Sequence, residues 1–319
     1  MARAIYFDHD GALDDLLSLT LLTRYRGVSL KGVTVTPADC LIEPAVSVTR
    51  KILDLAGAQH VPVAAGTLAG PNPFPLEWRV DALRADALPV LNQRAENTAR
   101  LSPLPAHLQL AEWLSTAPEP VTLLMIGPLT NLAWCLREHP EVESKIAELV
   151  FMGGAIDVAG NVDRPGHDGS AEWNVYWDPA AARRVFESEI PITLFPLDAT
   201  DQVPITPEFA RSFGRHYGSP LSDLAGSLLA MTFGCFETTG FSYCCWDSLT
   251  TSYLAEPDLC EFEDVRCVVL TEGVSQGRTV RADSGRLVKC AKKVDAQRFY
   301  RHCLDVLAES TGTPAFSTQ

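Results

Sequence analysis

The sequence lacks the features that mark disulfide-rich, zinc-binding and membrane-spanning proteins. Its nine cysteines are scattered, odd in number and without a C-x-x-C pair. This usage argues against a disulfide framework or a structural zinc site and favours reduced, mostly buried thiols. No apolar run reaches transmembrane length, and the first residues lead into a strand-like segment instead of a signal peptide. We therefore expect a cytoplasmic protein that does not engage the membrane.

Positive charge is also scarce. The chain has 26 lysines and arginines against 40 aspartates and glutamates, a net charge of −14. Such an acidic chain is poorly suited to binding nucleic acid or an anionic membrane, since both are negatively charged. Its 319 residues, 46% of them apolar, suffice for one large α/β domain or two small ones. The composition fits an enzyme acting on small molecules, and equally any other soluble acidic protein.

Apolar strand-like runs alternate with helical patterns through the first two-thirds of the chain. The expected strands are Ala4–Phe7, Val28–Val35, Val61–Ala65, Val121–Ile126, Ile146–Met152 and Ile192–Pro196, and the expected helices are Leu13–Tyr25, Leu41–Ala56, Glu96–Thr116, Leu129–Arg137 and Pro179–Phe186. This alternation is typical of a mostly parallel sheet with helices on both faces. Further extended segments are expected near Val265–Leu270, Thr279–Ala282 and Leu287–Cys290, before a final helix over Ala296–Glu309. No linker is evident, so we predict one α/β domain over residues 1–319.

Three segments have no regular pattern. Pro71–Pro89 is rich in proline and charge, Gly153–Asn174 is rich in glycine and aspartate, and Gly234–Trp246 mixes glycine, threonine and aromatic residues. Long loops inside a compact domain are commonly functional. Ligands of open parallel sheets bind at the carboxyl ends of the strands, so we expect the active site at that edge.

A cluster of aspartates lies near the start of the chain. Asp8, Asp10, Asp14 and Asp15 place four carboxylates within eight residues. Their mutual repulsion is costly unless a cation is bound or the groups are protonated. Carboxylates at a strand end and in the first turn of a helix suit an oxygen-seeking ion such as Ca²⁺ or Mg²⁺. The alternative is that Asp14 and Asp15 only cap the helix.

The first half of this cluster, Asp8-x-Asp10-Gly, resembles the first motif of the haloacid-dehalogenase phosphatases. That resemblance implies an Mg²⁺-dependent phosphatase with Asp8 as nucleophile. The later Ser/Thr, Lys and acidic pair of that family have no convincing counterpart in the sequence. The Asp14-Asp15 pair is not part of its pattern either.

Three other segments support a different family. They are Ile126-Gly-Pro-Leu-Thr-Asn-Leu-Ala133, then Phe151-Met-Gly-Gly-Ala155 followed by Gly160-Asn161, and then Glu172-Trp-Asn-Val-Tyr-Trp-Asp-Pro179. Together with the aspartate cluster, they resemble the nucleoside hydrolases, which cleave the N-glycosidic bond of ribonucleosides. The resemblance runs from residue 4 to about residue 255 in consistent order. The joint match is specific, although each segment alone is weak to moderate.

The resemblance implies a role for each matching residue. Asp10, Asp15 and Asp247 would bind Ca²⁺ with the backbone carbonyl of Ile126, and Asp10 would also be the general base. The implied ribose-binding residues are Asp14, Met152, Asn161, Glu172 and Asn174. These residue types suit the chemistry, because negative charge stabilises an oxocarbenium-like ribosyl group and a metal can hold the diol and a water together. The same resemblance suggests a homodimer.

Three features that depart from the commonest family pattern indicate which nucleobase the substrate carries. Trp246 precedes Asp247 where many members have histidine, Asp39 stands where many have asparagine, and Trp78 lies in the early loop. These features resemble the inosine-adenosine-guanosine-preferring subgroup, which implies a purine stacked between Trp78 and Trp246. Stacking favours a protonated purine, so solvent could protonate the leaving group, with Asp39 assisting.

Plainer interpretations remain open for several of these residues. Asn161 follows a glycine and could serve a turn, while Glu172, Asn174 and Asp247 could cap helices. The two tryptophans could be ordinary core or loop packing. A non-catalytic nucleoside-binding protein on the same fold is therefore a second alternative, besides the phosphatase.

Overall fold

The computed structural model describes residues 2–93, 97–216, 218–233 and 242–308. Its strands are β1 (Arg3–His9), β2 (Val28–Val35), β3 (Val63–Ala65), β4 (Val121–Met125), β5 (Ile146–Met152), β6 (Ile192–Phe195), β7 (Cys260–Val269), β8 (Thr279–Arg281) and β9 (Arg286–Val294). Its α-helices are α1 (Leu13–Leu22), α2 (Ile42–Leu55), α3 (Asp81–Asp86), α4 (Ala106–Thr116), α5 (Thr130–Glu138), α6 (Trp173–Trp177), α7 (Pro179–Phe186), α8 (Leu197–Thr200), α9 (Pro207–Ser212), α10 (Pro220–Met231), α11 (Trp246–Ser252) and α12 (Ala296–Ala308). None of the described helices is both long and apolar enough to cross a membrane.

The strands form one sheet in the order β3-β2-β1-β4-β5-β6-β9-β7-β8. The seven from β3 to β9 in this order pair in parallel, and β7 runs antiparallel to both β9 and β8. The strand order reverses between β1 and β4. From β1 the chain adds β2 and β3 on one side, and from β4 it adds β5 and β6 on the other. This is the kind of position at which parallel sheets form ligand sites.

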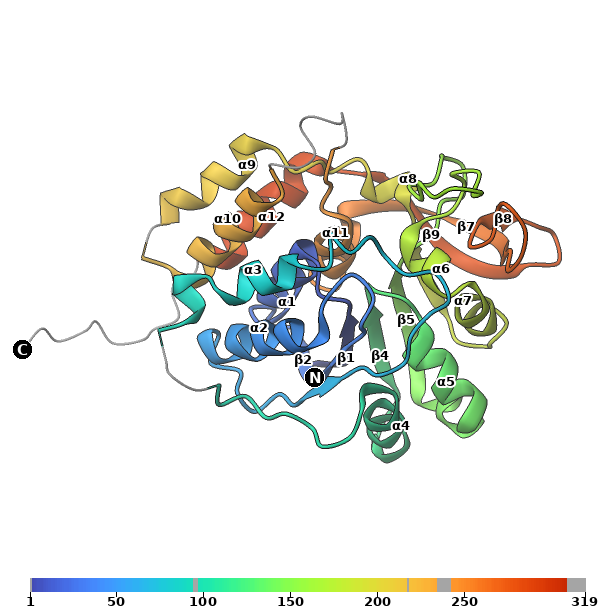
Figure 1. Ribbon diagram of the computed structural model, residues 1–319, viewed down its shortest axis with the longest axis horizontal. Coiled ribbons are helices and arrows are strands. Elements are labelled where there is room, and N and C mark those ends of the chain that lie inside the picture. Colours follow the sequence, from blue (N-terminus) through green and yellow to red (C-terminus); the bar gives the residue numbers. More distant parts are fainter. Residues whose placement is uncertain (1, 94–96, 217, 234–241, 309–319) are drawn as a thin grey trace, which may run out of the picture.

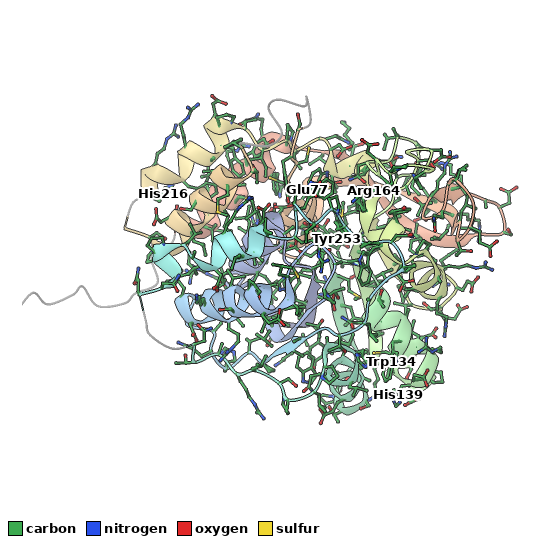
Figure 2. All side chains as sticks on the ribbon, in the orientation of Figure 1. Glu77, Trp134, His139, Arg164, His216 and Tyr253 are labelled. Atoms are coloured by element: carbon green, nitrogen blue, oxygen red, sulfur yellow. The ribbon has the colours of Figure 1, made fainter. Side chains whose placement is uncertain are left out.

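Helices cover both faces of the sheet (Figure 1). Along β4, Leu124 packs in one core cluster with α1, α2 and α10–α12, while its neighbours Leu123 and Met125 pack in a second cluster with α4, α5 and α7. Successive strand side chains point to opposite faces, so one apolar strand supplies both cores. Side chains fill both layers between the ribbons (Figure 2).

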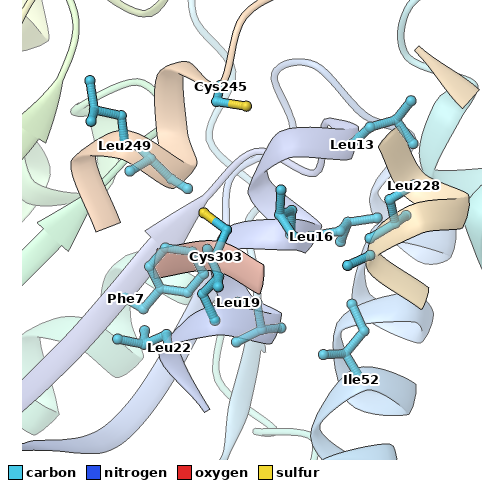
Figure 3. Packing of buried hydrophobic residues seen from close by; sticks show 14 of the residues in the cluster. Phe7, Leu13, Leu16, Leu19, Leu22, Ile52, Leu228, Cys245, Leu249 and Cys303 are labelled. Carbon is cyan, nitrogen blue, oxygen red and sulfur yellow. The ribbon is translucent and has the colours of Figure 1, made fainter. Parts of the chain in front are cut away.

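Helix α1 is buried along its whole length. Leu13, Leu16 and Leu19 contact the same cluster as Phe7 of β1 and Leu249 of α11 (Figure 3). A helix whose residues are all buried is enclosed by other elements on every side. The acidic first turn of α1 is thereby held in place inside the protein.

The predicted fold class is confirmed, and the element errors are local. Val28–Val35, Ile146–Met152 and Pro179–Phe186 have the predicted bounds. The expected helix Glu96–Thr116 is wrong before Ala106, because Pro105 precedes the first turn and Leu101 pairs with Val63 in an extended bridge. The loop predicted over Pro71–Pro89 contains the short helix α3. Most of Gly234–Trp246 lies outside the described residues.

Candidate active site

One cavity opens at the carboxyl ends of β1, β4 and β5 and gathers residues from distant parts of the chain. It is lined by Asp10, Ala12, Asp15, Asp39, Phe74, Trp78, Asp81, Ile126, Met152, Asn161, Glu172, Trp173, Asn174, Tyr243, Trp246 and Asp247. Every residue that the nucleoside hydrolase resemblance implies for catalysis, metal binding or substrate binding is in this set except Asp14. The convergence follows from parallel strand ends meeting at one edge of the sheet.

A tight turn brings Asp10 and Asp15 together. The Asp10 N–H donates to Asp15 Oδ1 at 3.1 Å, and the Asp39 N–H donates to Asp10 Oδ2 at 3.2 Å. Gly11 has φ +88°, and an added Cβ there would lie 2.7 Å from Cys40 Cβ. Only glycine meets both demands without strain, so Gly11 lets the strand end turn directly into α1.

Asp14 contacts the predicted site residue Asp247 but is not among the residues that line the cavity. Its Oδ2 accepts hydrogen bonds from the backbone N–H groups of Asp247 at 2.7 Å and Ser248 at 3.2 Å, and its Oδ1 accepts from Ser248 Oγ at 2.6 Å. It is buried and does not line the cavity. The Asp14 oxygens thus cap the first turn of α11, and its contact with ribose stays a prediction.

A second group of polar contacts orders the part of the cavity beside the ends of β4 and β5. Asn174 Nδ2 donates to the carbonyl oxygens of Ile126 at 2.9 Å and Met152 at 3.2 Å, which ties α6 to the ends of β4 and β5. Glu172 caps α6: Oε1 accepts from Asn174 N–H at 2.8 Å, and Oε2 accepts from Gly154 N–H at 2.8 Å. Asn161 Oδ1 accepts from Trp173 N–H at 3.2 Å. The cap considered from the sequence was for the Pro179 helix, and that prediction is wrong, because Asp178 caps α7 while Glu172 caps α6. Glu172 also lines the cavity.

Aromatic side chains form the outer part of the cavity. Trp78 meets Trp173 edge-on with ring centroids 5.3 Å apart, and Phe74 lies 4.9 Å from Trp173. Trp246 also lines the cavity, and its ring lies 4.7 Å from the ring of Tyr243. Flat apolar walls of this kind suit a planar aromatic ligand.

Among the residues described at the cavity, many carry a carboxyl group and none carries a positively charged side chain. Burial raises the pKa of Asp10 to about 7 and that of Glu172 to about 7. Burial and then repulsion from neighbouring carboxylates hold the pKa values of Asp15, Asp39 and Asp247 well above their ordinary range. The described residues that line the cavity include no lysine or arginine. Such a cluster calls for protons or a cation.

The donor set fits a hard divalent cation. Oδ2 of Asp15 and Oδ1 of Asp39 are buried without a hydrogen-bond partner, and unpaired buried carboxylate oxygens are costly. Asp10, Asp15, Asp247 and the Ile126 carbonyl would supply only oxygen ligands, the type that Ca²⁺ prefers. As positioned, the described residues contain no group of three or more His, Cys, Asp or Glu spaced for a metal ion. Binding would therefore require side-chain adjustment within the cavity.

Asp8 and His9 both point away from the cavity. Asp8 accepts hydrogen bonds from Thr34 Oγ1 at 2.5 Å, Thr36 Oγ1 at 2.8 Å and Asn131 Nδ2 at 2.9 Å. This enclosure leaves Asp8 no access to a substrate and argues against the phosphatase alternative. His9 is buried beside Thr49, and burial lowers its pKa to about 3, so its ring is neutral and not a general acid.

Five lining residues were not among the proposed site residues: Ala12, Phe74, Asp81, Trp173 and Tyr243. Trp173 lies between Glu172 and Asn174, Tyr243 lies three residues before Trp246, and Phe74 lies in the same proline-rich loop as Trp78. These three aromatic residues could have been proposed from the sequence, because each lies in an irregular segment near a proposed site residue. Asp81 carried no such signal, because the short helix on which it lies was not predicted.

Comparisons with known proteins agree with this geometry. The family model of the inosine-uridine preferring nucleoside hydrolases matches residues 5–301. A pyrimidine-specific ribonucleoside hydrolase RihA from Photobacterium profundum is 34% identical over 278 residues, 84% of each chain. The structure of an inosine-uridine preferring nucleoside hydrolase from Bacillus anthracis has a TM-score of 0.91 at 42% identity and covers 96% of this chain and 99% of its own. A purine-preferring ribonucleoside hydrolase from Gardnerella vaginalis shares the fold, with a TM-score of 0.78 at 24% identity over 96% of this chain and 98% of its own.

Proposed function

Because the chain belongs to the inosine-uridine preferring nucleoside hydrolase family, we propose that it hydrolyses the N-glycosidic bond of purine ribonucleosides in a Ca²⁺-dependent reaction. The substrates are inosine, adenosine or guanosine, and the products are the free base and ribose. Action in the cytoplasm as a homodimer remains a prediction from the sequence.

One observation supports this proposal above all others. A single cavity combines the buried carboxylates Asp10, Asp15 and Asp247 with the tryptophans Trp78 and Trp246. Departure of the base leaves positive charge on the ribosyl group, which buried carboxylates stabilise. The aromatic walls match the planar base that is leaving. The cavity thus contains groups suited to each of the two parts of a nucleoside.

At the ribose end, Asp10 takes the proton from the attacking water as general base. Asn161, Glu172 and Asn174 present polar groups to the sugar hydroxyls, and Met152 packs beneath the ring. Asp10, Asp15, Asp247 and the Ile126 carbonyl would hold Ca²⁺. When bound, the ion would keep these carboxylates ionised at neutral pH and polarise hydroxyl oxygens.

At the base end, no side chain among the described lining residues is an obvious strong acid. Trp78 and Trp246 stack on the purine and favour its protonated form through cation–π attraction. Asp39 is buried, its pKa is well above the ordinary range, and one of its oxygens is unpaired. In its protonated form Asp39 can donate a hydrogen bond toward the leaving group.

The names of several relatives favour a second candidate, in which pyrimidine nucleosides are the preferred substrates. RihA proteins at 31–34% identity are named pyrimidine-specific. A pyrimidine offers less area for stacking and has no N7, so the two tryptophans favour a purine. Base preference is therefore decided by kinetics on both classes.

The test measures initial rates of base release from inosine, adenosine, guanosine, uridine and cytidine, with inosine monophosphate as a phosphatase substrate. Higher kcat/KM for the purine nucleosides supports the proposal, and higher values for uridine or cytidine replace it with the pyrimidine candidate. Phosphate release alone, or binding without turnover, would refute nucleoside hydrolysis. Loss of activity in EDTA that is restored by Ca²⁺ tests the metal.

A further inference from the structure

A carboxylate outside the cavity holds one of the stacking residues. The indole N–H of Trp246 donates to Asp201 Oδ1 at 2.8 Å. Asp201 is the residue that ends α8, and it is not among the residues that line the cavity. A hydrogen bond to an ionised acceptor is stronger and more directional than one between neutral groups.

The backbone around this contact is braced as well. Ile205 N–H donates to the Tyr243 carbonyl at 2.8 Å, and Cys245 N–H donates to the Val203 carbonyl at 2.9 Å. Pro204 and Cys244 form an antiparallel bridge between these two bonds. The segment that leads into Trp246 is therefore paired with the segment that follows Asp201.

The indole ring is thus constrained from two directions. The carboxylate of Asp201 holds its N–H edge, and the ring of Tyr243 lies against it at 4.7 Å with an interplanar angle of 47°. A tryptophan side chain turns about two torsions, and a bond at its far edge restricts both. A wall that is already oriented loses less entropy when a planar ligand stacks on it.

The charge of Asp201 also acts through the indole. A carboxylate that accepts a hydrogen bond from the indole N–H polarises this bond. The polarisation makes the face of the indole ring more electron-rich. That face then attracts a protonated purine more strongly than a neutral base. This electrostatic effect grows as positive charge develops on the leaving group, so it acts more on the transition state than on the bound nucleoside.

We propose that Asp201 is a positioning residue for the leaving base, acting through the indole N–H of Trp246. This inference rests on the proposed function and deepens it. Orientation of the ring accounts for binding of the base, and the added electron density accounts for its departure in protonated form.

The kinetic test is a double-mutant cycle on inosine hydrolysis. Asp201→Ala removes the acceptor, Asp201→Asn retains an oxygen without the charge, and Trp246→Phe retains a ring without the N–H. We expect Asp201→Ala to lower kcat/KM about tenfold, with most of the loss in kcat, and Asp201→Asn about threefold. In the Trp246→Phe background, Asp201→Ala should change the rate less than about twofold. Exposed Asp264 on β7 provides the matched control, Asp264→Ala.

Two further measurements do not depend on turnover. In a ¹H–¹⁵N spectrum of the indole groups, the resonance that disappears in Trp246→Phe should shift in Asp201→Ala and stay in place in Asp264→Ala. Hypoxanthine binding, followed by tryptophan fluorescence, should weaken about threefold in Asp201→Ala, because only the orientation of the ring acts on a neutral base. An unmoved indole resonance, or an equal loss of rate in both backgrounds, would overturn the role of Asp201. If the wild type releases base from no nucleoside, the proposed function fails, and the hypoxanthine and indole measurements still decide on Asp201.

Discussion

At the scale of single residues, Asp10 has the most functions to fulfil. Its carboxylate lies beside Asp15 and Asp39, and burial raises its pKa to about 7. We expect Asp10→Asn to lower kcat for inosine by at least about 100-fold, since it removes both the general base and a metal ligand. Stopped assays of hypoxanthine release measure this, with Asp264→Asn as control. Near-normal turnover in a folded Asp10→Asn protein would rule out the assignment.

The aromatic walls make a prediction about selectivity. Trp246→Ala removes one face of the stack and should lower kcat/KM for inosine about tenfold more than for uridine, because a purine has more area to lose. Parallel assays on the two nucleosides give the ratio. Trp134→Ala on α5, where the ring packs on His107, is the control for loss of a tryptophan elsewhere. An equal loss on both substrates would remove stacking as the source of base preference.

At the scale of elements, two helices are joined at their first turns. Asp14 in the first turn of α1 accepts hydrogen bonds from the first turn of α11, which carries Trp246 and Asp247. The acidic cluster therefore does more than face a ligand, because one of its members fixes the helix that brings the distal carboxylate to the cavity.

This contact predicts a combined loss of stability and activity. Asp14→Ala should lower the free energy of unfolding by about 1–3 kcal/mol, since it leaves two buried N–H groups of α11 without their acceptor. Urea unfolding measures the change, and Ser248→Ala, which removes only the hydroxyl donor, should cost less. The rate of inosine hydrolysis should also fall, because Asp247 and Trp246 would no longer be held in place. Unchanged stability in Asp14→Ala would show that α11 does not depend on this cap.

At the scale of the whole molecule, the buried carboxylates make folding depend on pH and on cations. Burial raises the pKa values of Asp8 and Asp14 to about 6 and those of Asp10 and Glu172 to about 7. The folded protein therefore holds protons that the unfolded chain has already released. The stability that these groups contribute is complete at low pH and is lost as the pH rises through 6 to 7.

We therefore expect the Tm in EDTA to fall between pH 5 and pH 8. Ca²⁺ should raise the Tm more at pH 8 than at pH 5, because it binds the ionised carboxylates of the folded state. Thermal unfolding followed by circular dichroism at both values measures this, and Asp10→Asn should flatten the dependence. A Tm in EDTA that rises over this interval would contradict the prediction.

Local patterns in the sequence were sufficient for the parallel α/β architecture and for most of the site. A buried strand such as β5 and an acidic turn such as Asp10–Asp15 are set by neighbouring residues, and parallel strand ends necessarily meet at one edge. The extended course of residues 97–105 could not be predicted, because the bridge between Val63 and Leu101 joins distant segments. The same holds for Asp14 as the cap of α11 and for Asp201 as the support of Trp246. The hydrogen bonds of these two aspartates connect residues 233 and 45 positions apart, so only the tertiary structure decides which groups meet.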